Sequence, residues 1–399
     1  MNAKFRILMK RNLVIIVIYL LPLALAAQDT IQKPRVFKLS GYITNMQSAM
    51  FADIKDNWIN DNLIHNRLNL FWTPNKEITT TVQIRNRFFT GETVKYQPGY
   101  DSLMETNHEL IKLTKNLASE NSFLLNTAID RLYFNYSSEK IEVTLGRQRI
   151  NWGQTFVWNP NDIFNNYSFF DFDYEEKPGA DAARVQYYTS STSSLQVAVA
   201  ANYDKKITGG LLWKTNRWNY DFQFLGGMLN QQDAVAGFGW SGYIKSLGFR
   251  GEMSYFYPVD DYAGSSEQFM ASIEADYTFG NSIIIQGEFL YSQIPDDYQL
   301  TDFEQFYYRP MSVRNLTFTD YNFFLQTTIP VTPLLNFTAS GMYMPEVNGY
   351  FAGPSLEYSL TDNLFASFLI QKFYLELDQS GTMQKINLSL AFLRLKLHF

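Results

Sequence analysis

The sequence predicts an all-β fold, a transmembrane antiparallel β-barrel of about eighteen strands, with sixteen as the alternative and one long loop folded inward. Three observations support this prediction. Segments of roughly ten residues that alternate between polar and apolar recur from Val36 onward. Aromatic residues make up 17% of the chain, and Cys is absent. Short turns alternate with longer loops along the chain, as in bacterial outer-membrane barrels.

The N-terminus predicts a secretory signal peptide over residues 1–27, which leaves 28–399 as one barrel domain. A basic stretch ending at Arg11 precedes an apolar core from Leu13 to Leu25, and small residues follow for cleavage. An uncleaved anchor is the alternative, but the apolar run is short for a membrane span. Removing the peptide takes away four positive charges and lowers the net charge from −6 to −10, which argues against nucleic acid as a partner.

The predicted strands are amphipathic with a period of two, because lipid lies outside a barrel of this kind and water inside. Near the third segment, for example, Val82 and Ile84 share one face while Arg85 and Arg87 share the other. An even number of strands places both termini in the periplasm. The predicted strands cover residues 36–51, 63–72, 78–89, 129–136, 141–145, 182–189, 195–203, 207–214, 218–228, 235–244, 247–257, 268–277, 282–291, 315–328, 335–343, 350–360, 365–375 and 386–399.

A long insertion, residues 91–126, separates the third and fourth predicted strands. Ser102 to Glu105 fits a helix capping box. Leucines then recur at helical spacing, at Leu103, Leu110, Leu113 and Leu117. We therefore expect a short surface helix whose apolar stripe packs on the barrel rim, with a partner-binding face as the alternative.

The chain is organised around the stretch Leu145–Gly153, where the fifth strand enters a long aromatic and acidic segment, residues 154–181. That segment has too many rings for a solvated loop, so we expect it to fold into the barrel and bury them on the inner wall. In the alternation of the fifth strand, Arg147 and Arg149 fall at positions that would face lipid. Either a β-bulge at Gly146 turns them inward, which we favour, or the strand has already left the hydrocarbon.

Arginines gather on the polar faces of the early strands. Guanidinium groups confined in a lumen attract anions and orient carboxylates through paired hydrogen bonds. Alternatively they pair with acids of the inserted loop, so that removing the loop would unmask positive potential and shift selectivity towards anions. The candidate pore-constriction residues are Arg67, Arg85, Arg87, Arg131, Arg147, Arg149, Asp162, Asp171, Asp173 and Glu175.

Catalysis finds little support, so we expect neither an enzyme nor a cofactor. No zinc-protease, nucleophile-elbow or phosphate-loop motif occurs. The absence of Cys excludes thiolate metal sites, and Asp260-Asp261 does not extend into a calcium loop, so we expect no metal. A hydrolase embedded in the barrel, the alternative, would depend on His65.

The last strand alternates Leu with basic residues and ends on Phe399. A terminal Phe closing such a strand resembles the signal read by the barrel insertion machinery. We therefore expect outer-membrane lipid, that machinery and a small-molecule solute as partners.

The signal peptide, the barrel pattern, the terminal Phe and the motif Gly146-Arg147-Gln148 with Trp152-Gly153 together resemble the large Gram-negative porin-like and alginate-export-like barrels. The strands rich in Tyr and Asn resemble proteins of Bacteroidetes. The resemblance implies an outer-membrane channel for passive or facilitated diffusion of small polar solutes. A polysaccharide exporter, or a barrel subunit of a secretion or assembly complex, is the alternative.

Overall fold

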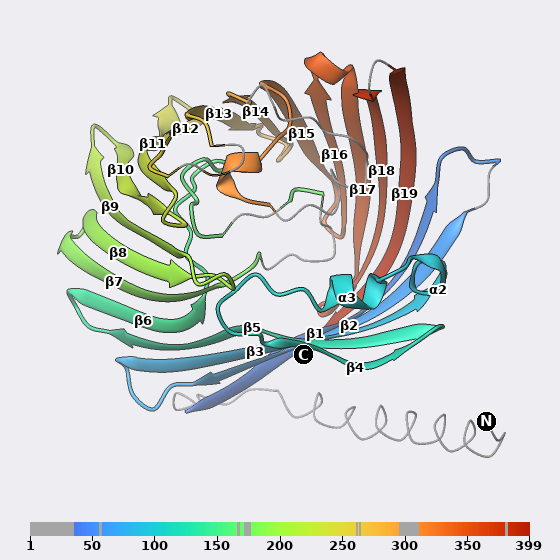
Figure 1. Ribbon diagram of the computed structural model, residues 1–399, viewed down its shortest axis with the longest axis horizontal. Coiled ribbons are helices and arrows are strands. Elements are labelled where there is room, and N and C mark those ends of the chain that lie inside the picture. Colours follow the sequence, from blue (N-terminus) through green and yellow to red (C-terminus); the bar gives the residue numbers. More distant parts are fainter. Residues whose placement is uncertain are drawn as a thin grey trace.

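A computed structural model describes residues 36–55, 58–165, 168–170, 177–260, 262, 265–294, 311–379 and 382–399. Eighteen of its strands close into one antiparallel barrel, because β19 (Thr382–His398) pairs with β1 (Phe37–Phe51). A further strand, β4 (Thr114–Glu120), pairs with β5 (Phe123–Ser137). Figure 1 shows the strands as a ring around segments that lie inside it. The predicted barrel of eighteen strands is confirmed.

The remaining elements follow in chain order. The strands are β2 (Ile59–Trp72), β3 (Ile78–Gly91), β6 (Ile141–Gln148), β7 (Ala180–Ser190), β8 (Ser193–Ala201), β9 (Ile207–Arg217), β10 (Tyr220–Leu229), β11 (Asp233–Ile244), β12 (Leu247–Pro258), β13 (Gln268–Thr278), β14 (Ile284–Ser292), β15 (Tyr321–Thr332), β16 (Leu335–Met344), β17 (Gly349–Thr361) and β18 (Leu364–Gln379). The helical turns are α2 (Glu92–Tyr96), α3 (Tyr100–Met104), η2 (Val313–Asn315) and η3 (Pro345–Val347). Within the described ranges, no helix has the length and apolar character needed to cross a membrane.

The wall follows the alternation that the sequence predicts. In β8, Val197 and Val199 are 45% and 46% exposed on the outer face, while Gln196 and Ala198, which alternate with them, are buried on the inner face. The same alternation places polar side chains of neighbouring strands in the lumen, where they contact one another and the inserted loop. The core of this protein is therefore inside the barrel.

The insertion does contain a short helix, α3, which includes Leu103, but the predicted continuation through Leu110, Leu113 and Leu117 is wrong, because residues 114–120 form strand β4. The physical reason is an open edge: β6 pairs with β5 only along Leu132–Ser137, which leaves the other half of β5 without that neighbour. β4 pairs with this half, between residues 123 and 128. Helical spacing of leucines cannot outweigh a full set of ladder hydrogen bonds. The predicted capping box is also wrong, since α3 begins with Gly99 as its N-cap.

The insertion completes the wall beside the short strand β6. The N–H of Tyr203, just beyond β8, donates to the carbonyl of His108 at 3.0 Å, and Glu109 forms an antiparallel bridge with Asn202. On the other side the N–H of Ile129 in β5 donates to Leu113 at 2.9 Å. Residues 108–120 thus connect β5 to β8 where β6 and β7 do not extend.

The bulge in this region lies in β5 and not at Gly146. The β3–β5 register shifts between Gln83 and Ile84, so that no residue of β3 lies opposite Asp130 in the ladder, and Asp130 faces the lumen together with Arg131. Both ladders of β6 run without a shift. Gly146 instead has φ +113°, and a Cβ there would lie 2.3 Å from the carbonyl oxygen of Leu132. Only glycine fits that approach.

The terminal residue closes the barrel. The backbone of Phe399 exchanges two hydrogen bonds with Gly41 of β1, at 2.9 and 3.0 Å. Its side chain is 47% exposed on the outer surface.

Candidate functional site: a lumen narrowed by an inserted loop

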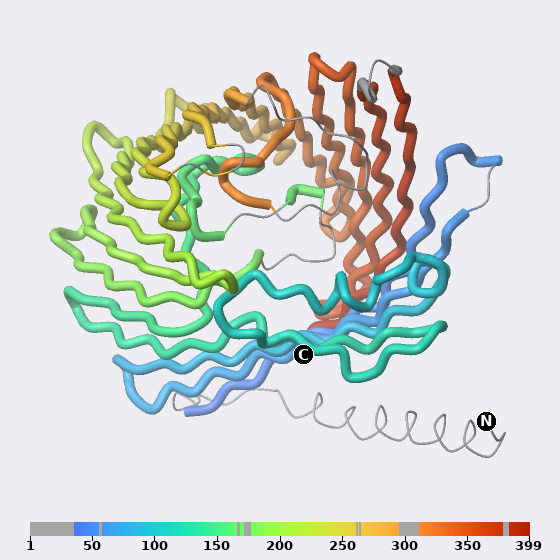
Figure 2. Tube along the Cα trace, in the orientation of Figure 1, coloured from blue at the N-terminus to red at the C-terminus, as the bar shows by residue number. Residues whose placement is uncertain are grey.

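The chain between β6 and β7 folds into the lumen, as the sequence predicts. Figure 2 shows the green trace of residues 149–165 inside the ring of strands. Ile150 and Trp152 have no exposed surface, and Trp158 has 5%. The loop therefore occupies space that would otherwise be water.

Three glutamates on neighbouring strands hold the loop against the wall. Glu252 of β12, Glu274 of β13 and Glu288 of β14 point inward and lie beneath the loop, each less than 5% exposed. They accept hydrogen bonds from four backbone N–H groups and one hydroxyl within residues 154–158 of the loop. Those donors are Gln154 N and Thr155 Oγ1 to Glu252 (3.2 and 2.8 Å), Phe156 N to Glu274 (2.8 Å), and Val157 N and Trp158 N to Glu288 (2.7 and 2.9 Å).

The rings of the loop are buried on the inner wall, as expected from their number. Trp152 donates its indole N–H to Gln196 of β8, and its ring meets Phe164 edge-on with centroids 4.8 Å apart. Farther along, Phe169 contacts Phe324 of β15 at 5.0 Å. Phe170 contacts the rings of Phe351 and Phe373, each at 5.1 Å, on β17 and β18. The loop thus follows the wall from β8 to β18.

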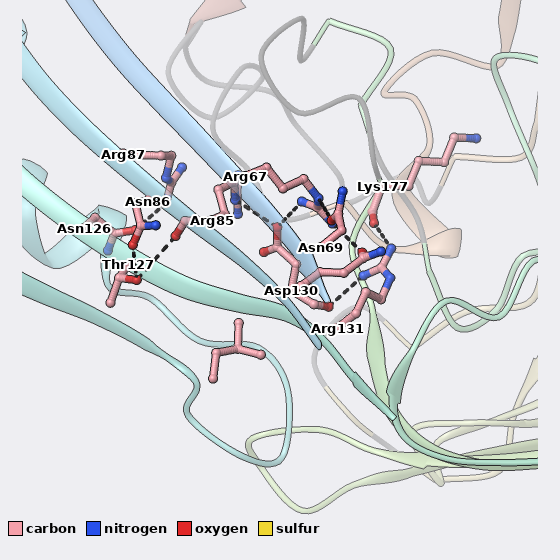
Figure 3. A network of polar contacts seen from close by, with 12 residues as sticks. Arg67, Asn69, Arg85, Asn86, Arg87, Asn126, Thr127, Asp130, Arg131 and Lys177 are labelled. Atoms are coloured by element: carbon pink, nitrogen blue, oxygen red, sulfur yellow. Dashed lines mark hydrogen bonds and ion pairs between the residues drawn. The ribbon is translucent and has the colours of Figure 1, made fainter. Parts of the chain in front are cut away.

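An arginine cluster occupies the wall opposite this path, on β2, β3 and β5 (Figure 3). Asp130 is its centre: Arg67 Nη1 lies 2.6 Å from the carboxylate and Arg85 Nε lies 3.1 Å from it. All three side chains are at least nine-tenths buried. Arg67 also donates to Gln83 at 2.7 Å. Paired guanidinium groups of this kind need a carboxylate, because an unpaired buried charge is costly.

Two further predicted arginines flank that cluster. Arg87 donates to Asn126 at 3.0 Å, and its guanidinium lies 5.2 Å from the ring centre of Phe89. Arg131 donates to the backbone carbonyl of Lys177, at the point where the loop returns to the wall. Figure 3 shows this bond at one end of the network. Arg131 therefore joins the arginine cluster to the inserted loop.

Arg147 belongs to the wall and not to the lumen. Its guanidinium forms a bidentate pair with Asp181 of β7, at 2.8 and 2.9 Å. The same two residues bind the backbone of Ile111 in the insertion, whose N–H donates to Asp181 at 2.8 Å and whose carbonyl accepts from Arg147. The pair clamps β6, β7 and the insertion together.

Arg149 and Asp162 pair within the loop, with 3.6 Å between nitrogen and oxygen. Asp162 is 1% exposed. Burial raises the pKa of Asp162 to about 7, against the opposing effect of the positive charge of Arg149. This carboxyl group therefore changes its charge within the physiological pH range.

Sequence reasoning named acids of the loop and missed acids of the wall. Asp130 of β5, which contacts Arg67 and Arg85, was missed, and so were the wall glutamates that bind the loop. Asp171, Asp173 and Glu175 lie outside the described residues. A signal for Asp130 did exist, since two consecutive charged residues in an alternating strand indicate a bulge. The glutamates could have been found from their inward parity on three successive strands.

Open spaces remain beside the loop, on the side of the short turns. One cavity of about 320 Å³ is lined by polar residues that include Arg131, Glu142, Arg149 and Arg184. A second, of about 430 Å³, lies near the turn at residues 190–194. The lumen is narrowed but polar.

A closed antiparallel barrel of eighteen strands, apolar outside and polar inside, defines the class of large outer-membrane barrels. No family model and no curated protein matches the sequence. Solved structures do match, and they are Gram-negative outer-membrane porins. OccK8 (OprE) of Pseudomonas aeruginosa has a TM-score of 0.57 and 9% identity, over 91% of this chain and 98% of that one.

Two other structures are similar to the same extent. OccAB3 of Acinetobacter baumannii has a TM-score of 0.56 and 10% identity, over 91% of this chain and 99% of its own. OpdQ of P. aeruginosa has a TM-score of 0.55 and 8% identity, over 92% and 99%. At such identities the likeness establishes a shared fold along nearly the whole chain.

Proposed function

We propose that this protein is an outer-membrane channel through which small polar solutes diffuse, passively or with facilitation. The observation that carries the proposal is a polar lumen narrowed by a loop that is bound to the wall. Such a loop limits the size of the solute while leaving an aqueous path. The porin fold of the structural neighbours supports the same function.

The arginine cluster is the proposed selective part of the constriction. Arg67 and Arg85 contact the carboxylate of Asp130, and Arg87 and Arg131 extend the same cluster on β3 and β5 (Figure 3). Guanidinium groups that face a confined lumen favour anions. Arg149 and Asp162 add a second pair on the loop itself.

The alternatives from the sequence gain less support. A polysaccharide exporter needs a wide continuous lumen, whereas residues 149–165 cross this one. An enzyme would depend on His65, whose ring is 1% exposed and packs edge-on against Tyr42 at 5.3 Å. The Bacteroidetes origin and the signal peptide stay predictions.

Planar bilayers test the proposed function. We expect discrete conductance steps from the purified protein, and a reversal potential in a salt gradient that indicates anion preference. The triple variant Arg67→Gln, Arg85→Gln, Asp130→Asn should have a weaker anion preference. The reduction should be larger at low salt, because charges are then screened less. A folded protein that inserts without conducting would overturn the proposal.

The assembly role of Phe399 is a separate proposal. Its two backbone hydrogen bonds to Gly41 seal the barrel, and its exposed ring is available to another protein before closure. Replacing Phe399 by Asp should lower the amount of protein in the outer membrane while secretion to the periplasm continues. Normal outer-membrane levels would contradict this role.

A further inference from the structure

One cavity of the lumen is lined by polar side chains whose hydrogen-bonding capacity is only partly used. Its volume of about 320 Å³ corresponds to about ten water molecules and lies in the usual range of ligand-binding pockets. The lining residues belong to β3, β5, β6 and β7 near the short turns, and the cavity extends to Arg131 and Arg149 beside the inserted loop. A solute that passes the constriction on its way to the short turns therefore meets this cavity.

Three polar side chains of the cavity converge on Glu142 and Thr144 of β6. The amide nitrogen of Asn135 donates to Glu142 at 3.1 Å and to Thr144 Oγ1 at 2.9 Å. Arg184 of β7 donates to the same two side chains, with 3.2 Å to Thr144 Oγ1. Gln148 donates to the backbone carbonyl of Thr144 at 3.0 Å. These bonds hold Asn135, Arg184 and Gln148 in fixed positions around one point, as a preformed binding site requires.

Each of these three side chains keeps one group that forms no hydrogen bond with any described residue. Both bonds of Asn135 use its nitrogen, so its side-chain oxygen remains an acceptor. Gln148, which is 2% exposed, also donates only through its nitrogen, to Thr144 and Ala182, and its side-chain oxygen is buried without a partner. The Nε of Arg184 is buried without a partner as well. The cavity therefore offers two free acceptors and one free donor.

Tyr133 of β5 adds an aromatic ring to the same cavity. The side chain is partly buried, and it forms neither a hydrogen bond nor a ring contact with any described residue. Strand pairing sets Tyr133 opposite Gly146 of β6, which has no side chain to cover the ring. An open ring of this kind packs against the C–H groups of a ligand, while polar groups around it bind the ligand's hydroxyls.

We propose that this cavity binds a neutral sugar or polyol of about monosaccharide size. The assignment depends on the proposed channel function, because the sugar reaches the cavity as a solute of that channel. A hydroxyl group both donates and accepts, so the hydroxyls of one sugar satisfy the oxygens of Asn135 and Gln148 together with the Nε of Arg184. The ring of the sugar packs on Tyr133.

The cavity favours a neutral ligand over an anion. An ionised carboxylate only accepts hydrogen bonds, so the two free side-chain oxygens would stay unpaired beside it. Two guanidinium groups at the cavity are also close to carboxylates of the protein: Arg184 contacts Glu142, and Arg149 lies 3.6 Å from Asp162. The ion preference proposed for the arginine cluster and the binding of a sugar here are therefore properties of different residues.

D-glucose tests the proposal in planar bilayers, with acetate as the anionic probe. We expect glucose on both sides of the bilayer to reduce the ion current through the wild-type channel in a saturable way, at millimolar concentration. Acetate at constant ionic strength should not displace it. A channel that conducts but whose current glucose leaves unchanged would overturn the sugar site. A folded protein that inserts without conducting would instead overturn the proposed channel function.

Single substitutions locate the binding of glucose in this cavity. Tyr133→Leu removes the ring and should raise the glucose concentration for half-maximal block about tenfold, whereas Tyr133→Phe keeps the ring and should behave as the wild type. Gln148→Met removes the buried acceptor at similar length and should weaken the block about tenfold as well. Tyr136→Leu, on the outer face of the same strand, is the matched control and should change nothing. Unweakened block in Tyr133→Leu, or displacement of glucose by acetate, would overturn the proposal.

Discussion

Asp130 connects two buried arginines at the proposed constriction. Its carboxylate contacts two buried guanidinium groups, those of Arg67 and Arg85. Asp130→Asn removes the carboxylate that both contact, and breaking a buried ion pair in this way costs on the order of 3–5 kcal/mol. We expect a lower unfolding temperature in detergent, measured by heat-modifiable migration. Glu139→Gln removes the same charge at an exposed turn and should change little. Equal stability of the two variants would show that the arginines have other sufficient partners.

Asp162 makes the loop sensitive to pH. Its pKa in the folded protein, about 7, lies above the unfolded value of 3.8, so the folded state binds the proton more tightly. The stabilisation is complete below about pH 4 and is lost as the pH rises through 7, at about 1.4 kcal/mol per pH unit between those limits. Urea unfolding in vesicles at pH 5, 6, 7 and 8 should show this decline in the wild type. In Asp162→Asn the decline should be smaller, and parallel curves for the two proteins would contradict the assignment.

At the scale of elements, the glutamates of β12, β13 and β14 determine where the loop lies. A hydrogen bond to a charged group contributes about 1.5–3 kcal/mol, against about 0.5–1.5 kcal/mol for a neutral one. Replacing Glu252, Glu274 and Glu288 by Gln keeps the size of each side chain and weakens its bonds to the loop. We expect a noisier open channel, because the loop then leaves the wall more often, and unchanged noise would contradict this role. Glu77→Gln, in an exposed turn, is the control.

The elements show where sequence reasoning succeeds and where it fails. The period-two alternation predicts the strands because outward side chains contact lipid and inward side chains contact water along the whole of each strand. It cannot predict β4, which becomes a strand only because β6 stops and leaves half of β5 unpaired. The alternation also does not predict the position of the bulge. Both Gly146 and Asp130 interrupt the polar and apolar alternation, and only the pairing of β5 and β6 with their neighbours shows that the bulge is at Asp130. The inward loop was predictable from its rings, but its attachment points lie about a hundred residues away in sequence.

At the scale of the molecule, the arginine cluster and the three wall glutamates lie on different parts of the lumen wall. The arginine cluster lies on β2, β3 and β5, and the three glutamates lie on β12, β13 and β14 beneath the loop. In the native protein the loop backbone covers the carboxylates, so the arginines contribute more to the potential that a solute experiences. The ion selectivity of the channel therefore depends on whether the loop covers the glutamates or the arginines.

Deleting residues 154–176 and joining the ends with a short glycine-serine linker tests this arrangement. Conductance should rise, because the loop no longer fills part of the cross-section. Selectivity should shift towards cations, since Glu252, Glu274 and Glu288 become exposed to the lumen. This is the opposite of the shift expected if loop acids neutralise the arginines. The change in reversal potential should be larger at low salt, where charges are screened less.

The same deletion in a protein with all three glutamates replaced by Gln separates the two effects. Conductance should rise as before, because the cross-section is equally enlarged, but the shift towards cations should disappear. The variant also shows whether the barrel closes without the loop, through its heat-modifiable migration. Unchanged conductance in both deletions would mean that the loop does not restrict the pore. A shift towards anions in the first deletion would mean that the arginine cluster, and not the wall glutamates, determines the potential of the open lumen.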